Sequence, residues 1–258
     1  MKKLLIIPAV LLLTGCLFIT SCSNADNNAA MKAPVQENTA STGKSGEKEA
    51  NENGLTENEK NSIAKPASYN TGAEAASKTT DNMQAAFKGE TTASAKYAAY
   101  SKKAAQEGYH EIALLFKAAS TAENIHASNH KAVLLESGVT VPAIKPEFTV
   151  KTTKENLQDA IAGETYEATT MYPEFLTAAS KEGNQIAIIS LNYAYKTEKK
   201  HKAFYEEALA ALQNNTVKAL PTVFYVCPTC GNTYQTTAPA RCGISMTSGE
   251  KFLKITSL

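Results

Sequence analysis

The 258-residue sequence has no tryptophan, one arginine, four histidines and almost no net charge. The lack of tryptophan, with aromatic residues at only 7%, argues against a large aromatic-rich β-sandwich. The single arginine, Arg241, argues against an enzyme that holds phosphate groups with guanidinium clamps. The 26 basic and 25 acidic residues leave a net charge of +1, so we expect no nucleic-acid partner.

The first 22 residues have the features of a bacterial lipoprotein signal peptide. Two lysines precede a short apolar run, which is the pattern of a secretory leader. Cys16 and Cys22 each follow small residues, as the acylated cysteine of a lipoprotein does. We expect lipidation at Cys22, because polar residues follow it, with Cys16 as the alternative. An ordinary secreted protein and an uncleaved anchor helix are the competing interpretations.

Residues 23–78 consist mostly of small and polar residues, with Tyr69 as the only aromatic residue. Such a segment cannot bury enough apolar surface to offset the entropy lost on ordering. The composition therefore predicts a disordered tether, which would hold the folded part roughly 40 Å from a membrane. Acyl chains at its start would anchor the protein in the bacterial cell envelope, on a periplasmic or outer surface.

From residue 79 onward, apolar residues recur with the period of a helix. Gly108 and Gly183 mark two short turns, whereas residues 138–148, with two prolines, form a longer connection. Two short-looped hairpins joined by one long crossover are the connectivity of a ferritin-like four-helix bundle. The fold class is therefore predicted to be mainly α, with helices at 79–107, 110–137, 153–181 and 185–213. The predicted parts are the bundle at 79–213, a linker at 214–222 and a small β-rich ribbon at 223–258.

The two halves of the predicted bundle repeat each other, with a slip of one residue. Glu90 corresponds to Glu164 at an offset of 74 residues, whereas Tyr97 corresponds to Tyr172 at an offset of 75. The third helix must absorb the extra residue, and a π-bulge is the economical way to do so. We predict this bulge between Glu167 and Tyr172, with none in the first helix.

Two Glu-x-x-His pairs stand at equivalent places in the repeat. A glutamate and a histidine three residues apart lie on one helix face, so both can reach the same metal ion. Each remaining helix adds a glutamate at the matching height, and the third helix adds a further one. Together they match the carboxylate pattern of di-iron bundles. The candidate ligands are Glu90, Glu123, His126, Glu164, Glu167, Glu198 and His201.

Oxygen-rich ligation with one imidazole per metal suits iron or manganese better than a closed structural zinc site. The other two histidines, His110 and His130, have no histidine partner in the repeat. We therefore expect both to be surface residues.

Residues 80–212 resemble the rubrerythrin family. The resemblance is carried by Ala86-Phe87-Lys88-Gly89-Glu90, Glu107-Gly108-Tyr109, both Glu-x-x-His pairs, Ala162-Gly163-Glu164-Thr165-Tyr166-Glu167 and Met171-Tyr172-Pro173. Members of this family are non-haem di-iron peroxidases that reduce hydrogen peroxide to water. The resemblance implies two iron ions as cofactors. It assigns Glu90, Glu123 and His126 to one iron and Glu164, Glu198 and His201 to the other, with Glu123 and Glu198 bridging.

The same resemblance implies further roles and partners. Glu167 matches a carboxylate that the family exchanges with a histidine when the redox state changes. Tyr97 and Tyr172 match tyrosines that orient the ligand carboxylates, so these three residues are the expected catalytic residues. The family also implies an electron-donor protein or reductase, and a homodimer in which one subunit's ribbon lies near the other's di-iron site.

The C-terminal ribbon contains an incomplete cysteine site. Cys227 and Cys230 form one Cys-x-x-Cys pair, but the second pair reads Cys242-Gly243-Ile244-Ser245. Tyr234, Pro239 and Phe252 still resemble the small core of rubredoxin. We expect a weakened mononuclear iron site with Ser245 in the fourth position. The alternatives are a zinc or metal-free structural knuckle and a relic of a lost site.

Three functions are compatible with this sequence. The first is a membrane-tethered peroxide reductase that protects against oxidative stress. The second is a ferritin-like ferroxidase or iron-handling lipoprotein, although such a protein needs neither Glu167 nor the ribbon. The third is a non-catalytic envelope lipoprotein carried on a stalk.

Overall fold

The computed structural model describes residues 77–258. The predicted signal peptide, the lipidation candidates Cys16 and Cys22, and the predicted tether up to residue 76 lie outside the described residues. Within residues 77–258, no helix is both long enough and apolar enough to cross a membrane.

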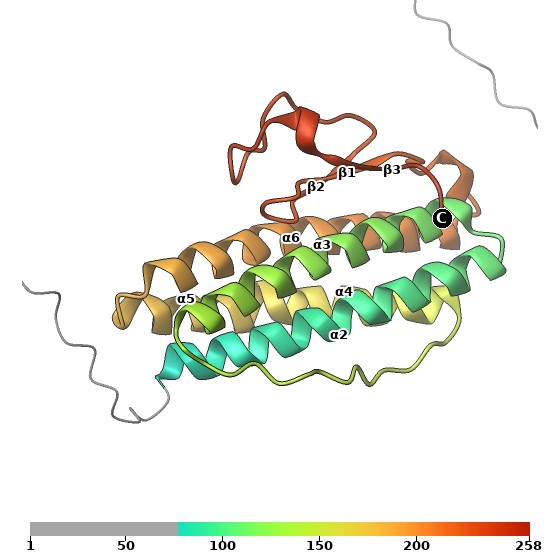
Figure 1. Ribbon diagram of the computed structural model, residues 1–258. Coiled ribbons are helices and arrows are strands. Elements are labelled where there is room, and N and C mark those ends of the chain that lie inside the picture. The colour runs from blue at the N-terminus through green and yellow to red at the C-terminus, as the bar shows by residue number, and fades with distance from the viewer. Residues whose placement is uncertain (1–76) are drawn as a thin grey trace, which may run out of the picture. The chain divides into compact units, whose positions relative to one another are not determined.

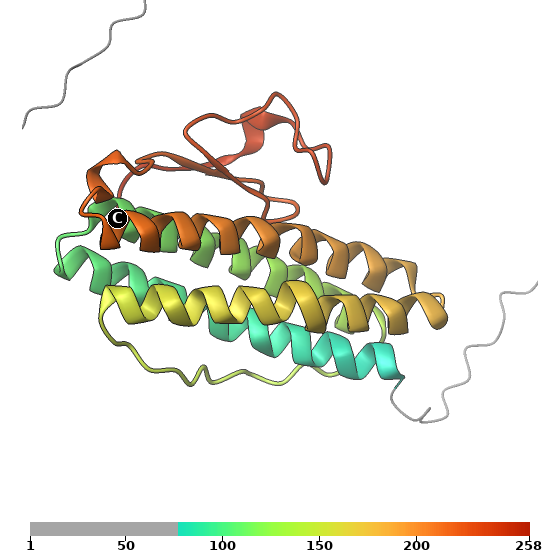
Figure 2. The ribbon, with the colours of Figure 1, turned by 180° about the vertical axis from the view of Figure 1, so that it is seen from behind.

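Four helical segments lie side by side in a bundle, as Figures 1 and 2 show. The long connection after α3 runs along the outside of the bundle beside α2 and α4 in both views. The mainly α fold and the expected helices are confirmed, with boundaries shifted by at most one residue. The helices are α2 (Lys78–Gln106), α3 (His110–Glu136), α4 (Thr153–Tyr166), α5 (Tyr172–Lys181) and α6 (Gln185–Gln213).

The helix boundaries follow from capping residues in the sequence. Thr152 and Glu155 form a capping box at the start of α4, and Asn184 accepts a hydrogen bond from the first turn of α6. Gly108 and Gly183 have φ values of +84° and +71°, which glycine adopts without steric cost. The two short turns therefore fall where the glycines predicted them.

The two hairpins also cap each other through repeat-related glutamates. Glu107, at the end of α2, accepts a hydrogen bond from the backbone N–H of Thr153 at 2.9 Å. Glu182, at the end of α5, accepts one from the backbone N–H of Thr79 at 3.1 Å. Each carboxylate satisfies an N–H at a helix start that would otherwise lack a partner. These contacts fix the position of one hairpin relative to the other along the bundle axis. They thereby help to bring side chains of the two hairpins to the same position along that axis.

The third helical segment is interrupted by a π-helical turn at Glu167–Met171. The backbone N–H of Tyr172 bonds to the carbonyl of Glu167, five residues back. By contrast, α2 is one uninterrupted α-helix. The predicted π-bulge is confirmed, and it absorbs the residue by which the two halves differ.

The C-terminal ribbon is a three-stranded antiparallel sheet in the order β2-β1-β3. Its strands are β1 (Phe224–Val226), β2 (Thr233–Gln235) and β3 (Leu253–Ile255). Both views show the ribbon lying over α3 and α6. Phe224 and Val226 are buried in the same apolar cluster as Phe116 and Tyr205 of the bundle. The ribbon is therefore anchored to the bundle by a shared core.

Candidate metal centre

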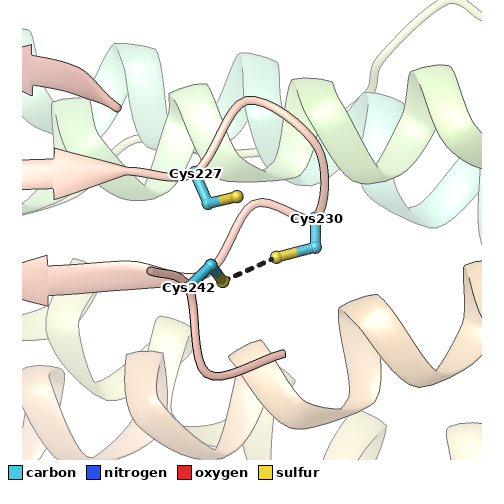
Figure 3. Close-up of side chains that lie close together, drawn as sticks. All are labelled: Cys227, Cys230 and Cys242. Carbon is cyan, nitrogen blue, oxygen red and sulfur yellow. Dashed lines mark hydrogen bonds between the residues drawn. The ribbon is translucent and has the colours of Figure 1, made fainter. Parts of the chain in front are cut away.

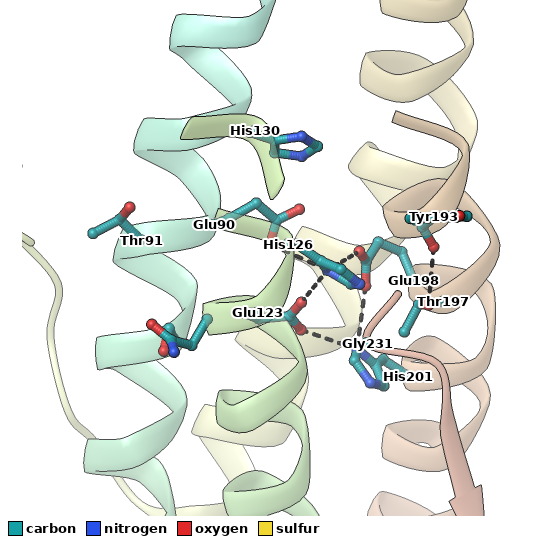
Figure 4. Close-up of polar contacts among 12 residues, drawn as sticks. Glu90, Thr91, Glu123, His126, His130, Tyr193, Thr197, Glu198, His201 and Gly231 are labelled. Carbon is teal, nitrogen blue, oxygen red and sulfur yellow. Dashed lines mark hydrogen bonds and ion pairs between the residues drawn. The ribbon is translucent and has the colours of Figure 1, made fainter. Parts of the chain in front are cut away.

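Six of the seven candidate ligands converge between the four helical segments, and Figure 4 labels all of these except Glu164. They form two groups of buried side chains, and in each group the possible ligand atoms lie within 4.8 Å of one another. Glu123 and Glu198 belong to both groups, as expected of bridging carboxylates. The first group adds Glu90 and His126, and the second adds Glu164 and His201.

The two imidazoles face the centre with the same ring nitrogen. Nδ1 of His126 lies 2.8 Å from Glu123 and 3.0 Å from Glu198. Nδ1 of His201 lies 2.9 Å from Glu123 and 3.1 Å from Glu198. Each bridging carboxylate therefore offers one oxygen to each histidine. The centre has an approximate twofold symmetry that follows from the sequence repeat.

A tyrosine from the opposite half holds each terminal glutamate. The hydroxyl of Tyr97 donates to Glu164 Oε1 at 2.8 Å, and the hydroxyl of Tyr172 donates to Glu90 Oε1. Both tyrosines are almost fully buried. The expected supporting contacts of Tyr97 and Tyr172 are therefore present, and they fix one oxygen of each carboxylate.

Burial of so many carboxylates changes their proton affinities. Burial, together with the charges of Glu198 and Glu123, raises the pKa of Glu90 to about 8. Burial and the same two neighbours also raise the pKa of Glu164 well above its usual range. Burial alone would raise the pKa of Glu123 too, but the adjacent His201 and His126 lower it to about 2. Without metal, the centre must therefore retain protons to limit repulsion between its carboxylates.

The residues present fit a pair of metal ions. Among the described residues, Glu123 Oε1 and Oε2, Glu90 Oε2, Glu164 Oε2, Glu198 Oε1 and His126 Nδ1 are buried without a hydrogen-bond partner. Buried polar atoms ordinarily have partners. Because these unpartnered atoms all point toward one centre, they indicate that cations bind there. Four carboxylates and two imidazoles are the donor set of di-iron and di-manganese bundles.

The ribbon covers the outer side of both histidines. His126 Nε2 lies 3.1 Å from the carbonyl oxygen of Cys230, and His201 Nε2 lies 3.0 Å from Thr233 Oγ1. These contacts leave Nδ1 of each ring free for metal and fix the ring orientation. The chain's own ribbon makes these contacts, so the site is covered within a single chain.

Gly231 makes this close approach possible, and sequence reasoning did not identify it. Its φ is +74°, and an added Cβ would overlap His126 Nε2 and lie 3.1 Å from the carbonyl oxygen of Ala122. The glycine after a Cys-x-x-Cys pair was visible in the sequence. Its contact with the bundle could not be read there, because it depends on how the ribbon packs.

Glu167 lies in the π-helical turn and is only half-buried. It belongs to neither group of converging ligand atoms. Burial, with the charges of Glu90 and Glu198, raises its pKa well above the usual range. Its proposed exchange with a histidine therefore stays a prediction.

The prediction that His130 lies on the surface is wrong. His130 is completely buried, one helical turn beyond His126 (Figure 4), and contacts Ser190 and Tyr172. The second half has no histidine at the equivalent position, but the residue at the 75-residue offset from His130 is Tyr205. That pairing of two buried rings was the missed signal. His110 is exposed, as expected.

Three buried cysteines of the ribbon also converge (Figure 3). Cys230 Sγ lies 3.4 Å from Cys242 Sγ, and Cys227 Sγ lies 3.3 Å from Ser245 Oγ. A hydrogen bond from Cys230 lowers the pKa of Cys227 to about 4. Ser245 therefore stands beside the thiols, at the fourth corner of a site that three thiolates could offer to iron or zinc.

The aromatic core predicted for the ribbon is present. The rings of Tyr234 and Phe252 are stacked, with centroids 5.4 Å apart and planes inclined by 9°. The hydroxyl of Tyr234 also lies 3.5 Å from Cys242 Sγ. Tyr234 therefore links the aromatic pair of the ribbon to its cysteine site.

Comparison with known proteins identifies the bundle. The family model described as rubrerythrin matches residues 81–209. Rubrerythrin-2 of Clostridium acetobutylicum is 33% identical over 178 residues, covering 67% of this chain and 95% of that protein. Nigerythrin of Nitratidesulfovibrio vulgaris is 34% identical over 155 residues, covering 59% and 74% of the two chains.

A solved structure extends the match to three dimensions. The fully reduced, all-ferrous state of nigerythrin superposes with a TM-score of 0.62 at 31% identity. The match covers 72% of this chain and 91% of that structure. Together with the paired carboxylate and histidine groups, these similarities show that the chain belongs to the rubrerythrin family of di-iron oxidoreductases.

Proposed function

We propose that this protein reduces hydrogen peroxide to water at its di-iron centre, as a defence against oxidative stress. The observation that carries the proposal is the pair of converging ligand groups that share Glu123 and Glu198. Two shared carboxylates require the two metal positions to be adjacent, which suits a two-oxygen substrate. A pair of ferrous ions there would supply one electron each and polarise both peroxide oxygens as Lewis acids.

The protein's own residues prepare this chemistry. The carboxylates offset the positive charge that grows when the ions are oxidised. Tyr97 and Tyr172 keep Glu164 and Glu90 oriented, and the ribbon keeps both imidazoles oriented through their Nε2 atoms. Because all six ligands are almost fully buried, bulk water is kept away and the charges act in a low-dielectric environment.

The test is a comparison of two oxidants. The purified protein is loaded with iron, reduced anaerobically and mixed with hydrogen peroxide or oxygen in a stopped-flow spectrometer. We expect peroxide to oxidise the centre much faster than oxygen does. Oxidation no faster with peroxide than with oxygen would contradict the proposal.

The alternative, an iron-handling ferroxidase, predicts a different metal count. Metal analysis of anaerobically purified protein measures iron, manganese and zinc per chain, and visible spectra report any iron bound by thiolates. More than two irons retained in the bundle would favour the ferroxidase. A non-catalytic role requires that iron does not bind stoichiometrically, or that Glu123→Ala leaves binding unchanged.

We further propose that electrons from a donor protein or reductase enter through the ribbon. The cysteine site is next to the di-iron centre, because the carbonyl of Cys230 contacts His126. Ser245 supplies a hard hydroxyl where a soft thiolate is expected, so a bound iron would be held more weakly. Ser245→Cys should produce the visible absorption of four-thiolate iron and raise turnover with a reductase donor. If that variant shows no new thiolate-to-iron absorption, the ribbon is not an iron site.

We also propose a lipid anchor at Cys22, which places the enzyme at the envelope membrane. The support is the signal-peptide pattern and the polar tether that follows it. Cys22→Ser should move the protein from the membrane fraction to the soluble fraction, whereas the matched variant Cys16→Ser should leave it bound. The reverse result would assign the anchor to Cys16.

The homodimer implied by the family is likewise a proposal. The contact between ribbon and centre forms within one chain, so that contact alone does not require a second subunit. Light scattering on the soluble Cys22→Ser variant measures the oligomeric state directly. A monomeric mass would contradict the dimer.

A further inference from the structure

A line of buried polar side chains leads away from one terminal ligand of the centre. The hydroxyl of Tyr172 contacts Glu90, His130 Nε2 lies 3.2 Å from that hydroxyl, and His130 Nδ1 lies 2.8 Å from Ser190 Oγ. Glu90, Tyr172, His130 and Ser190 come from α2, α5, α3 and α6, respectively. All of them are buried, with Ser190, the most exposed, at 5%. Sequence reasoning identified Tyr172 and Glu90 but neither His130 nor Ser190.

The direction of each hydrogen bond in this line follows from Glu90, the carboxylate at its end. Glu90, as a metal ligand, can only accept, so Tyr172 must donate its hydroxyl proton to Glu90. The Tyr172 oxygen then accepts from His130, which requires the imidazole proton to be on Nε2. Nδ1 is left to accept from the hydroxyl of Ser190. A single neutral tautomer of His130 thus satisfies every group.

The charge state of His130 agrees with this assignment. Burial, together with the nearby His126, lowers the pKa of His130 to about 3. The ring is therefore neutral at physiological pH and carries one proton. Among the described residues, its two ring nitrogens have only Tyr172 and Ser190 as hydrogen-bond partners.

The other half of the bundle has no such line. At the 75-residue offset, His130 corresponds to Tyr205, Ser190 corresponds to Leu115, and Tyr172 corresponds to Tyr97. Tyr97 donates to Glu164, but it meets the ring of Tyr205 edge-on, with centroids 5.5 Å apart. The Tyr205 hydroxyl is buried without a hydrogen-bond partner among the described residues, and Leu115 offers none. Within residues 77–258, a chain of hydrogen bonds therefore continues beyond the tyrosine in the Glu90 half and not in the Glu164 half.

We propose that His130, held by Ser190, is a positioning residue that fixes the Tyr172 proton on Glu90 and thereby makes the two metal positions unequal. Consecutive hydrogen bonds polarise one another, so Tyr172 is a stronger donor than Tyr97. Glu90 is therefore held in its orientation more firmly than Glu164. The inference rests on the proposed function only in taking Glu90 as a ligand of the di-iron centre.

The first test reads the tautomer directly. Nitrogen-15 NMR of the histidine rings, in metal-free and zinc-loaded protein, distinguishes a proton on Nε2 from one on Nδ1. We expect His130 as the Nε2–H tautomer in the zinc-loaded form, in which Glu90 can only accept, and Ser190→Ala should alter its Nδ1 signal. A proton on Nδ1, or a doubly protonated ring at neutral pH, would overturn the proposal. This readout does not depend on any reaction with peroxide.

The second test uses Zn²⁺ binding and the internal repeat as a control. His130→Phe should weaken one of two stepwise zinc-binding events by about ten-fold, the lower end of the effect of outer partners on metal sites. The matched variant Tyr205→Phe, at the equivalent place, should change both events less than two-fold. Equal weakening by both variants would show only a general packing effect and would overturn the proposal.

A double variant separates positioning from packing. If His130 acts through Tyr172, then His130→Phe should have no further effect on zinc binding once Tyr172→Phe is present. Additive effects would overturn the proposal. Ser190→Ala, which removes one hydroxyl, provides the same cycle if His130→Phe does not fold. If His130→Phe has no further effect beside Tyr172→Phe, but the protein does not react with peroxide, the positioning role is supported and the proposed function is rejected.

Discussion

The two halves of the bundle are alike at the metal ligands and differ one layer further out. Glu90 and Glu164 are each held by a tyrosine, and His126 and His201 face the same two bridging carboxylates. Behind the tyrosines, one half has a polar pair and the other an aromatic cluster. The aromatic cluster contains Tyr97, Tyr100, Phe116 and Tyr205.

This difference shows which part of a duplicated site is constrained by the metal. Ligands must converge at the same height and in the same number, so both halves keep them. The supporting layer must only fill space and satisfy buried polar atoms, which hydrogen bonds or aromatic packing can each achieve. The halves can therefore diverge there and give the two metal positions different surroundings.

The largest expected effect comes from removing what the halves share. Glu123→Ala deletes a carboxylate common to both ligand groups, so iron content should fall from about two ions per chain to none. Glu206→Ala, which removes an exposed carboxylate from α6, should leave the iron content unchanged. Metal analysis of both purified variants checks this. Retention of one full iron by Glu123→Ala would mean that the two positions are held independently.

The next largest effect should come from separating the ribbon from the centre. Gly231→Ala places a Cβ against His126 and imposes a positive φ on alanine, which costs about 1–3 kcal/mol. Thermal unfolding should detect this loss, and the ribbon contact should loosen on the His126 side. Gly243→Ala in the same ribbon is the control, since its Cβ would meet only Tyr234 Oη, at 4.0 Å. Equal stability of the two variants would contradict the close docking of Gly231.

In the metal-free protein, one group from each half of the bundle, Glu90 or His201, makes stability depend on pH. The folded state raises the pKa of Glu90 to about 8 from an ordinary value near 4.5, mainly through burial. It raises that of His201 to about 9 from near 6.5: burial lowers the pKa, but Glu123 and Glu198 together outweigh this effect. Both groups hold protons that the unfolded chain releases, so stability falls as pH rises through these values.

Between pH 7 and 8, the unfolding free energy of metal-free protein should therefore fall by roughly 3 kcal/mol, because each of the two groups contributes about 1.4 kcal/mol per pH unit. Bound metal replaces the protons and should remove most of this slope. Glu90→Gln should remove the part of the fall that ends near pH 8 and leave the part due to His201, which continues to about pH 9. Chemical denaturation at several pH values measures both. Stability that rises across this range would contradict the assignment.

The smallest expected effect is the difference in metal binding between variants of the two tyrosines. Tyr172→Phe breaks a contact to Glu90 that also ends the polar line, whereas Tyr97→Phe breaks a single contact to Glu164. We expect each to weaken metal binding by about ten-fold or more, with Tyr172→Phe the more damaging of the two. Calorimetric titration with Zn²⁺ provides the comparison. Equal losses would show that support behind the tyrosine adds nothing.

Much of the fold and the ligand set could be predicted because the repeat constrains the sequence. The slip between the 74- and 75-residue offsets located the π-helical turn within Glu167–Met171. Gly108, Gly183 and the proline-containing connection located the helix ends to within one residue. These features depend on interactions between residues close in the chain, which a sequence displays directly.

The prediction failed for His130, and it missed Gly231 and Thr233. Whether a histidine is buried depends on which residues from other helices face it, and Ser190 lies 60 positions away. The approach of Gly231 to His126 depends on where the ribbon lies on the bundle. Neither contact leaves a local pattern, because its partners are distant in the chain.

The sequence by itself determined the mainly α bundle, the π-helical turn, the seven candidate ligands and their family. The reason is that helical period, capping and ligand spacing are short-range properties repeated twice along the chain. Only the tertiary structure decided that Glu167 lies outside the two converging ligand groups, and that the ribbon covers both imidazoles within one chain. It also decided that one half is supported by His130 and Ser190 while the other relies on aromatic packing. Those outcomes depend on how distant side chains share a limited buried space, where each polar atom must find a partner or a metal.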